Sequence, residues 1–179
     1  MEHLGLSVRF EPPGDSGAFS GHAAIFDTPN RHGEIVARGA FRKSLAEHKA
    51  AGTRPLMLWA HDLSDVIGVW TDIREDQTGL AVSGRLITET RRGAEAHALL
   101  KGGALDGLSI GFSVRGDKLG LNGLRTLTDI ELVEISLVGL PSARGARITE
   151  VRARSDGLST FAEACRHARC ALLAMKDSR

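Results

Sequence analysis

Short runs of apolar or alternating residues dominate the middle of the chain and predict β-strands. Five such runs follow one another between residues 55 and 140, with turns that contain Asp or Gly between them. The clearest turn is the polar segment 74–79, which has the composition of a hairpin loop. The expected strands here are Leu56–His61, Val66–Ile73, Leu80–Ile87, Leu108–Val114 and Thr128–Val138, and Leu4–Phe10 and Phe19–Phe26 have the same character nearer the N-terminus.

Helical spacing replaces this pattern in two places before residue 140. The segment Phe41–Ala51 puts its apolar residues on one side and ends before Gly52. The segment 90–101 ends at Gly102-Gly103, a typical C-terminal stop. Many short strands with few helices predict a mainly β fold with flanking helices (α+β), built as a small closed or half-closed barrel.

The last thirty residues differ in composition from the rest. They are rich in Arg and Ala, and their apolar positions predict an amphipathic helix. We therefore expect a β-barrel domain over residues 1–149 and a basic, Ala-rich helical tail over 150–179. The apolar positions that carry the tail prediction are Phe161, Ala164, Ala168, Leu172 and Met175.

Composition and charge restrict the classes of function. The chain has 179 residues, 42% of them hydrophobic, which is enough for a packed core without disulfide support. With 23 Lys and Arg against 22 Asp and Glu, the net charge of +1 gives no basic footprint for nucleic acid. No apolar run approaches the length of a membrane span, and the first residues lack the pattern of a signal peptide. These features predict a cytoplasmic protein that binds neither nucleic acid nor membrane.

The two cysteines do not predict a metal site. Cys165 and Cys170 flank His167, which gives three potential ligands. On a helix, however, residues five apart diverge, and a fourth zinc ligand is missing. We expect no metal and no cofactor.

His61 is the histidine with the strongest claim to a chemical role. It stands at the end of an apolar strand, where functional groups often emerge from a rigid scaffold. Its neighbour Asp62 would point to the opposite face if the strand continued, so Asp62 is a poor orienting partner. Taken alone, His61 is also compatible with a structural role.

Ser109 lies on an unusually bare face of its strand. Alternation places Ser109, Gly111 and Ser113 together, and a glycine there leaves room for another backbone or a ligand to approach closely. The alternative is an edge strand with small outward residues. The segment also matches Gly-x-Ser-x-Gly, but a nucleophile elbow needs a strand–turn–helix context and a suitable downstream histidine, and the β pattern continues here.

Two glutamates interrupt the apolar strand near residue 130. Glu131 and Glu134 fall on opposite faces, and both faces are otherwise largely apolar, so the strand is expected to be central and one carboxylate partly buried. A buried carboxylate needs a hydrogen-bonding partner. A histidine or an arginine would serve equally well.

Taken in order, these segments resemble the prohead (capsid-maturation) serine proteases of tailed phages, which are relatives of the herpesvirus assemblins. Gene transfer agents, which are phage-derived particles, encode such proteases too. The resemblance covers residues 21–141. Its blocks are Gly21–Asp27 with Gly39-Ala40-Phe41, Leu58–Asp62, Gly107–Phe112 and Leu132–Pro141.

The resemblance implies a twisted β-barrel with flanking helices and a Ser-His-acid triad. Matched position by position, Ser109 is the nucleophile, His61 the general base and Glu134 the third member. Assemblins have a second histidine where this chain has Glu134, and Glu131 competes for the role. The matching oxyanion donors fall in the loop formed by Ser142, Ala143 and Arg144.

The function implied is a serine endopeptidase that cleaves the scaffold, or the scaffold-like N-terminal segment of the major capsid protein, and itself during capsid maturation. Its partners would be the major capsid protein, the portal protein and further copies of itself, inside the prohead that assembles in the bacterial cytoplasm. The alternatives are a non-catalytic β-barrel assembly factor and a generic esterase on the same triad.

Overall fold

The strand β7 (Arg125–Val138) is the centre of the fold in this computed structural model, which describes residues 16–120 and 123–151. Antiparallel β6 runs along one edge of β7, while β2 and then β3 pair with its other edge in parallel. The sheet continues from β3 through β4, β5, β1 and β8. The other elements are β1 (Ala18–Ile25), β2 (Glu34–Val36), α1 (Arg42–Ala51), β3 (Leu56–Trp59), β4 (Asp62–Glu75), β5 (Gly79–Leu86), α2 (Arg91–Lys101), β6 (Gly107–Leu119) and β8 (Ile148–Val151).

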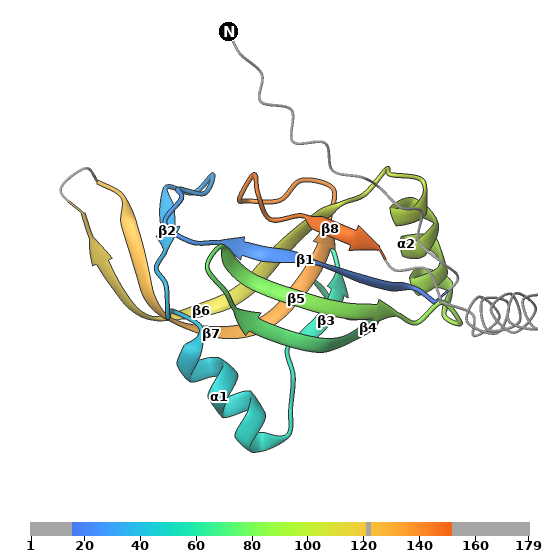
Figure 1. Cartoon of the computed structure of the whole chain (residues 1–179), viewed down its shortest axis with the longest axis horizontal. Helices are drawn as coiled ribbons and strands as arrows, with labels where there is room; N and C mark the ends of the chain where they lie inside the picture. The colour runs from blue at the N-terminus through green and yellow to red at the C-terminus, as the bar shows by residue number, and fades with distance from the viewer. Residues whose placement is uncertain (1–15, 121–122, 152–179) are drawn as a thin grey trace, which may run out of the picture.

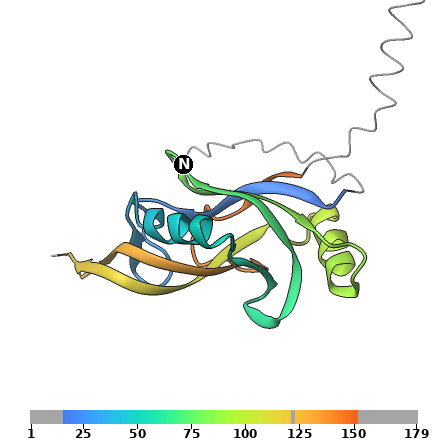
Figure 2. The same cartoon turned by 90° about the horizontal axis from the view of Figure 1, so that it is seen from below.

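The sheet curls so that the segment leading into its last strand, β8, lies beside the start of β6 (Figures 1 and 2). The Leu108 N–H donates to the Ala146 carbonyl over 3.0 Å, and the Ile148 N–H donates to the Asp106 carbonyl over 2.8 Å. Ile148 also pairs with Gly21 in β1. The segment 146–148 therefore joins β1 to β6 and closes this part of a half-barrel, while the β6–β7 hairpin extends beyond it (Figure 1).

The two helices cover separate parts of the sheet. Helix α1 packs on β7, where the buried Ser44 hydroxyl accepts the Leu132 N–H over 3.0 Å. It ends at Gly52, whose φ of 67° is the left-handed conformation that glycine adopts readily at a helix end. Helix α2 lies beside β4 and β5, and the Thr90 hydroxyl caps its N-terminus by accepting the Gly93 N–H.

The core fills the interior of the curled sheet with aliphatic and aromatic side chains. Trp70 and Phe19 pack edge to face with ring centroids 5.6 Å apart. The largest fully buried side chains are Trp70, Phe19, Phe41, Met57, Leu58, Ile67, Leu80, Leu86, Leu108, Leu127, Ile130 and Leu132. All of these residues lie in strands except Phe41, which is the N-cap of α1. Helix α2 adds the buried Ala96 and Leu100 to the same core, and Leu45 of α1 packs against it.

The structure confirms the predicted fold class and most of the predicted elements. It differs at the expected strand 56–61, which ends at Trp59, so that Ala60 and His61 form a turn. The short strands β2 and β8 were not predicted, and β8 extends two residues past the expected domain end at 149. The predicted strand 4–10, the tail helix and the cysteine pair lie outside the described residues.

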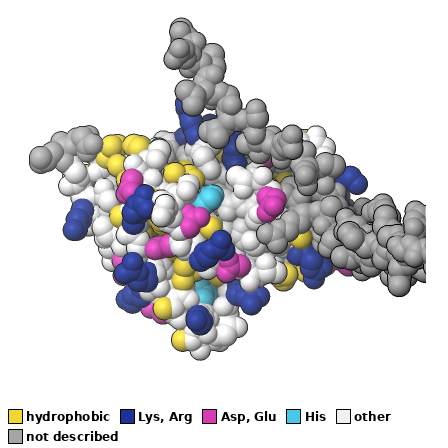
Figure 3. Space-filling view, viewed as in Figure 1, with side chains coloured by type: hydrophobic (Ala, Val, Ile, Leu, Met, Phe, Trp, Pro, Cys, Tyr) yellow, Lys and Arg dark blue, Asp and Glu magenta, His cyan; other side chains and the backbone are white. Residues whose placement is uncertain are grey.

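Charged side chains of both signs are interspersed on the face shown in Figure 3. Several are paired across elements, as with Arg125, which contacts Asp117 at 2.8 Å and Glu34 at 3.4 Å. Within residues 16–120 and 123–151, no helix has the length and apolar character needed to cross a membrane.

Gly21 is predicted to be necessary for closing the half-barrel. A Cβ atom there would lie 2.3 Å from the Arg147 carbonyl oxygen and 2.7 Å from the Ile148 Cα, both of which are backbone atoms. Gly21→Ala should therefore lower the free energy of unfolding by about 1–3 kcal/mol, as expected for overpacking. Gly139→Ala is the matched control because nothing lies within 4 Å of its added Cβ. Urea titrations in which the two variants lose equal stability would contradict this account of closure.

Candidate active site

His61 lies in the tight turn between β3 and β4. Trp59 pairs with Asp62, so Ala60 and His61 are the two central residues of a hairpin turn, with φ angles of 50° and 65°. Two successive left-handed residues define the type I′ turn, which usually takes Asn or Gly. Such conformations in other residues are strained and occur often at functional sites.

Both strained residues are bound to β7 through their own amides. The Ala60 N–H donates to the Leu137 carbonyl over 3.0 Å, and the His61 N–H donates to the Ser136 hydroxyl over 3.1 Å. The parallel pairing of β3 with β7 makes this contact available at the end of β3. The turn is therefore fixed against the central strand.

The Glu134 side chain contacts the His61 ring. Its carboxylate is buried, and one oxygen lies 2.5 Å from His61 Nδ1. The Ser136 hydroxyl donates to its other oxygen over 2.5 Å. An ionised carboxylate only accepts hydrogen bonds, so against ionised Glu134 it is His61 Nδ1 that donates, and in a neutral imidazole Nε2 then carries the lone pair.

Gly111 provides the space that Glu134 occupies. The two residues face each other across the β6–β7 pair. A Cβ on Gly111 would lie 2.1 Å from Glu134 Oε1 and 2.8 Å from Cδ. The bare strip expected on β6 is thus filled at Gly111 by the carboxylate, and a side chain there would push it away from His61.

Ser109 lies two residues before Gly111, on the same face of β6. It stands directly opposite Ser136 in the β6–β7 register, as Gly111 stands opposite Glu134. Facing residues of an antiparallel pair share a face of the sheet, so Ser109 is on the side that carries the Glu134–His61 pair. Ser109 is 7% exposed, whereas 44% of the His61 side chain is exposed. Among the described residues, the Ser109 hydroxyl forms no hydrogen bond with His61 or with another side chain.

Helix α2 holds the hairpin that carries His61. Arg92 Nε lies 2.6 Å from Asp65 on β4, and the guanidinium stacks 5.5 Å from the centre of the Trp59 ring. The hydrogen bond that Arg92 donates to the Asp65 carboxylate is the main cause that raises the pKa of Arg92 above its ordinary value. Both strands next to the turn are therefore attached to α2.

The competing acids lie elsewhere. Glu131 is exposed and pairs with Arg115 at 3.4 Å, while Arg115 also binds Glu47 at 2.7 Å. Asp62 accepts hydrogen bonds from the Ser64 hydroxyl and N–H, which lower the pKa of its carboxyl. Of the acidic residues considered from the sequence, the structure brings Glu134 to His61.

The loop after β7 lies beside the start of β6. Arg147 bridges to Gly107, two residues before Ser109. Ser142 and Ala143 line a small cavity together with Ile110 and Phe112, whereas Arg144 is exposed. The loop is thus next to the Ser109 strand. Among the described residues, its amides make no hydrogen bond to Ser109 that would identify the oxyanion donors.

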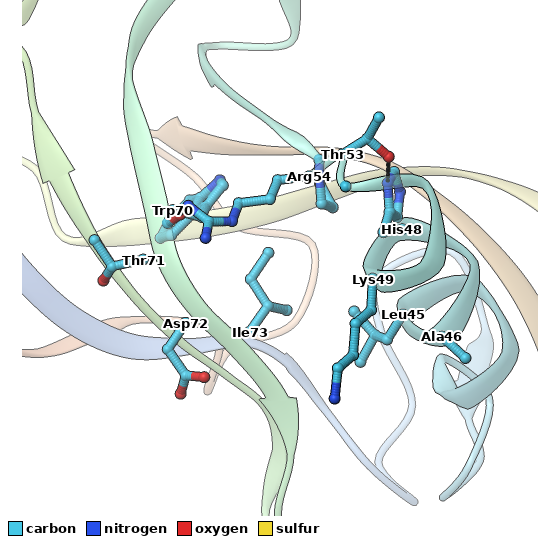
Figure 4. Close-up of a pocket in the computed structure, with 12 residues that line it drawn as sticks. Leu45, Ala46, His48, Lys49, Thr53, Arg54, Trp70, Thr71, Asp72 and Ile73 are labelled. Atoms are coloured by element: carbon cyan, nitrogen blue, oxygen red, sulfur yellow. Dashed lines mark hydrogen bonds between the residues drawn. The ribbon is translucent and has the colours of Figure 1, made fainter.

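A separate hollow lies away from these residues. It is a groove of about 990 Å³ between the second half of α1 and β4. Figure 4 shows Leu45, Lys49, Arg54, Asp72 and Ile73 around it. None of Ser109, His61 and Glu134 lines this groove.

Ser136 is the residue of this site that the sequence did not single out. It is fully buried, and its hydroxyl contacts both the His61 N–H and the Glu134 carboxylate. The available signal was its position two residues after Glu134, which places both side chains on one face of the strand.

Comparison with known proteins assigns the chain to a class of serine peptidases. Residues 6–160 match the caudovirus prohead serine proteases, and the chain belongs to that family.

The chain is also similar to individual proteins. The chain is 31% identical over 158 residues to the prohead protease of Enterobacteria phage HK97, a match that covers 86% of this chain and 68% of the relative. A 52-residue stretch is 40% identical to the major capsid protein of Lactococcus phage c2, covering 28% of this chain and 11% of that protein. The fold is similar to the capsid assembly protease of bacteriophage T4, with a TM-score of 0.59 and 14% identity over 73% of this chain and 93% of the other.

Substituting Gly111 should damage the site without removing the fold. In Gly111→Ala, the new methyl group and the Glu134 carboxylate cannot share the same space, and the carboxylate is the part that can rotate. Turnover per folded molecule should fall by about 10²-fold, the size expected from a displacement of about 1 Å. Gly116→Ala on the same strand is the control, because its nearest neighbour would be Thr128 Oγ1 at 3.3 Å. Equal proteolysis of capsid precursor by both variants would contradict the role given to Gly111.

Proposed function

We propose that this chain is a capsid-maturation endopeptidase in which Ser109 is the nucleophile, His61 the general base and Glu134 the residue that orients His61. Its substrate is the scaffold or the scaffold-like N-terminal segment of the major capsid protein, together with the protease itself. The reaction takes place inside the assembling prohead in the bacterial host.

The hydrogen bond between His61 Nδ1 and the buried Glu134 carboxylate carries this proposal. It leaves Nε2 of an exposed ring available to take a proton from a nearby hydroxyl. Ser109 is the serine of β6 that shares this face and lies closest along the register, opposite Ser136.

The chemical steps follow from these positions. The Ser109 oxygen attacks the scissile carbonyl carbon while its proton passes to His61 Nε2, and the imidazolium then returns that proton to the leaving amine. Glu134 stabilises the imidazolium through Nδ1. Water repeats the sequence on the acyl-enzyme, which releases the second product and restores the Ser109 hydroxyl.

The absence of a Ser109–His61 hydrogen bond is compatible with this role. Catalytic hydrogen bonds are often long before substrate binds and shorten in the reacting complex. Backbone amides of the loop Ser142–Arg144 are proposed as oxyanion donors, because this loop reaches the start of the Ser109 strand. Each such donor typically contributes about 3–4 kcal/mol to the transition state.

The choice of substrate rests on the relatives. One relative is named a prohead protease and another a major capsid protein. A partner that is itself part of the capsid therefore fits better than a small ester, and the major capsid protein is the proposed binding partner.

The nucleophile can be tested by co-expressing the chain with its cognate capsid protein. Ser109→Ala should give a folded protein that no longer shortens the capsid precursor, because it removes only the attacking oxygen. Ser113→Ala is the matched control: it lies on the same strand, is exposed, and should cleave at the wild-type rate. Gel mobility and mass spectrometry of the capsid protein provide the measurement.

Other outcomes identify the alternatives. Undiminished cleavage by Ser109→Ala would remove this serine from the role of nucleophile. A wild-type chain that promotes assembly but cuts nothing would be a non-catalytic assembly factor. Hydrolysis of small esters with the capsid precursor left intact would indicate a generic esterase.

The third member is tested by the two glutamates of β7. Glu134→Gln should reduce turnover by about 10–10³-fold, below the roughly 10⁴-fold loss for the equivalent change in a Ser-His-Asp enzyme, because the amide can hold the imidazole in the wrong tautomer. Glu131→Gln should change turnover little, since Glu131 is paired with Arg115 at the surface. Cleavage rates that collapse in Glu131→Gln and survive in Glu134→Gln would reverse the assignment.

A further inference from the structure

The buried Ser136 hydroxyl connects the two halves of the His61–Glu134 pair. It accepts the backbone N–H of His61 over 3.1 Å and donates its own hydrogen to Glu134 Oε2 over 2.5 Å. With the 2.5 Å contact between His61 Nδ1 and Glu134 Oε1, the three residues form a closed ring of hydrogen bonds. Few geometries satisfy all three bonds at once.

Each of these bonds fixes a group that would otherwise be free to move. The His61 N–H belongs to a strained turn residue, and the bond to Ser136 holds it at a positive φ. The Glu134 carboxylate is 5% exposed, and without Ser136 its second oxygen would have no hydrogen-bond donor within the described part of the chain. A buried carboxylate with an unsatisfied oxygen tends to rotate or to admit water.

We propose that Ser136 is a positioning residue of this active site, which sets the His61 backbone and the Glu134 carboxylate in register with each other. It does not contact substrate, because its side chain is fully buried. Its role rests on the proposed function of Ser109, His61 and Glu134. Ser136 faces Ser109 across the β6–β7 pair. The positioning residue and the proposed nucleophile are therefore direct neighbours on adjacent strands.

Helix α1 offers a matched control for the loss of a buried hydroxyl. Ser44 is 1% exposed, and its hydroxyl accepts the Leu132 N–H of the same β7 strand over 3.0 Å. Ser44→Ala therefore removes a buried serine hydroxyl and one bond to a backbone amide, as Ser136→Ala does, without touching His61 or Glu134. A general effect of hydroxyl loss on the fold would be common to both variants.

The test combines kinetics with the proton NMR signal of His61. In full-length protein, the hydrogen on Nδ1 that faces Glu134 should give a far-downfield resonance, because it lies in a short charge-assisted bond. Ser136→Ala should displace or broaden this resonance and lower kcat for purified capsid precursor by about 10–10²-fold, with KM little changed. Ser44→Ala should keep the resonance and the wild-type kcat per folded molecule. If Ser136→Ala is insoluble, Ser136→Cys preserves most of the volume with a weaker donor and acceptor, and should change both measurements in the same direction.

The outcomes separate this proposal from the function on which it rests. A Ser136 variant with the wild-type resonance overturns the positioning role, and so does one with an altered resonance but unchanged kcat. Equal kinetic losses in the Ser44 and Ser136 variants reduce Ser136 to a structural residue and overturn the proposal as well. If the wild-type chain cuts no capsid precursor, the proposed function fails, and the resonance alone decides whether Ser136 holds the pair.

Discussion

The buried carboxylate of Glu134 is the constraint on which the rest of this site depends. A charge taken out of water is costly unless nearby groups satisfy it. Here both oxygens are satisfied, one by His61 and the other by Ser136. Gly111 of β6 leaves the space that the Glu134 carboxylate of β7 occupies. The small residue on one strand therefore matches the large one opposite it.

That constraint explains features distributed along the chain. His61 and Glu134 are 73 positions apart, and the parallel pairing of β3 with β7 brings them together. The turn that carries His61 is strained, but β7 binds its amides and Arg92 of α2 binds its flanking strands. The proposed function and the fold therefore use the same contacts, since the strand at the centre of the sheet also carries Glu134 and Ser136.

The sequence was sufficient for the elements whose patterns are long. The two helices, the long strands and the central place of β7 follow from periodicity and from Gly stop signals. The three-residue β2 and four-residue β8 are too short for a pattern, and they exist because neighbouring strands pair with them. His61 was expected at the end of a strand because an apolar run leads up to it. Ala60-His61 lacks the Asn or Gly that would have indicated a type I′ turn, and the strain there is balanced by contacts that no local pattern contains.

The candidate site was predictable in its parts rather than in its connections. The resemblance to prohead proteases selected Ser109, His61 and Glu134, whereas alternation alone left Glu131 open. Gly111 was interpreted as room for another backbone or a ligand, whereas the structure places the side chain of Glu134 there. Ser136 was missed because a serine in a buried strand has no distinguishing sequence signal until its partners are placed in three dimensions.

Labelling of the full chain by a fluorophosphonate, followed by peptide mapping, tests the central claim most directly. If the Glu134–His61 pair activates the serine on its own face of the sheet, the adduct will lie on Ser109 and will be lost in His61→Gln. An adduct on Ser113 or Ser136, or labelling of Ser109 that persists at the same rate without the His61 imidazole, would contradict the account.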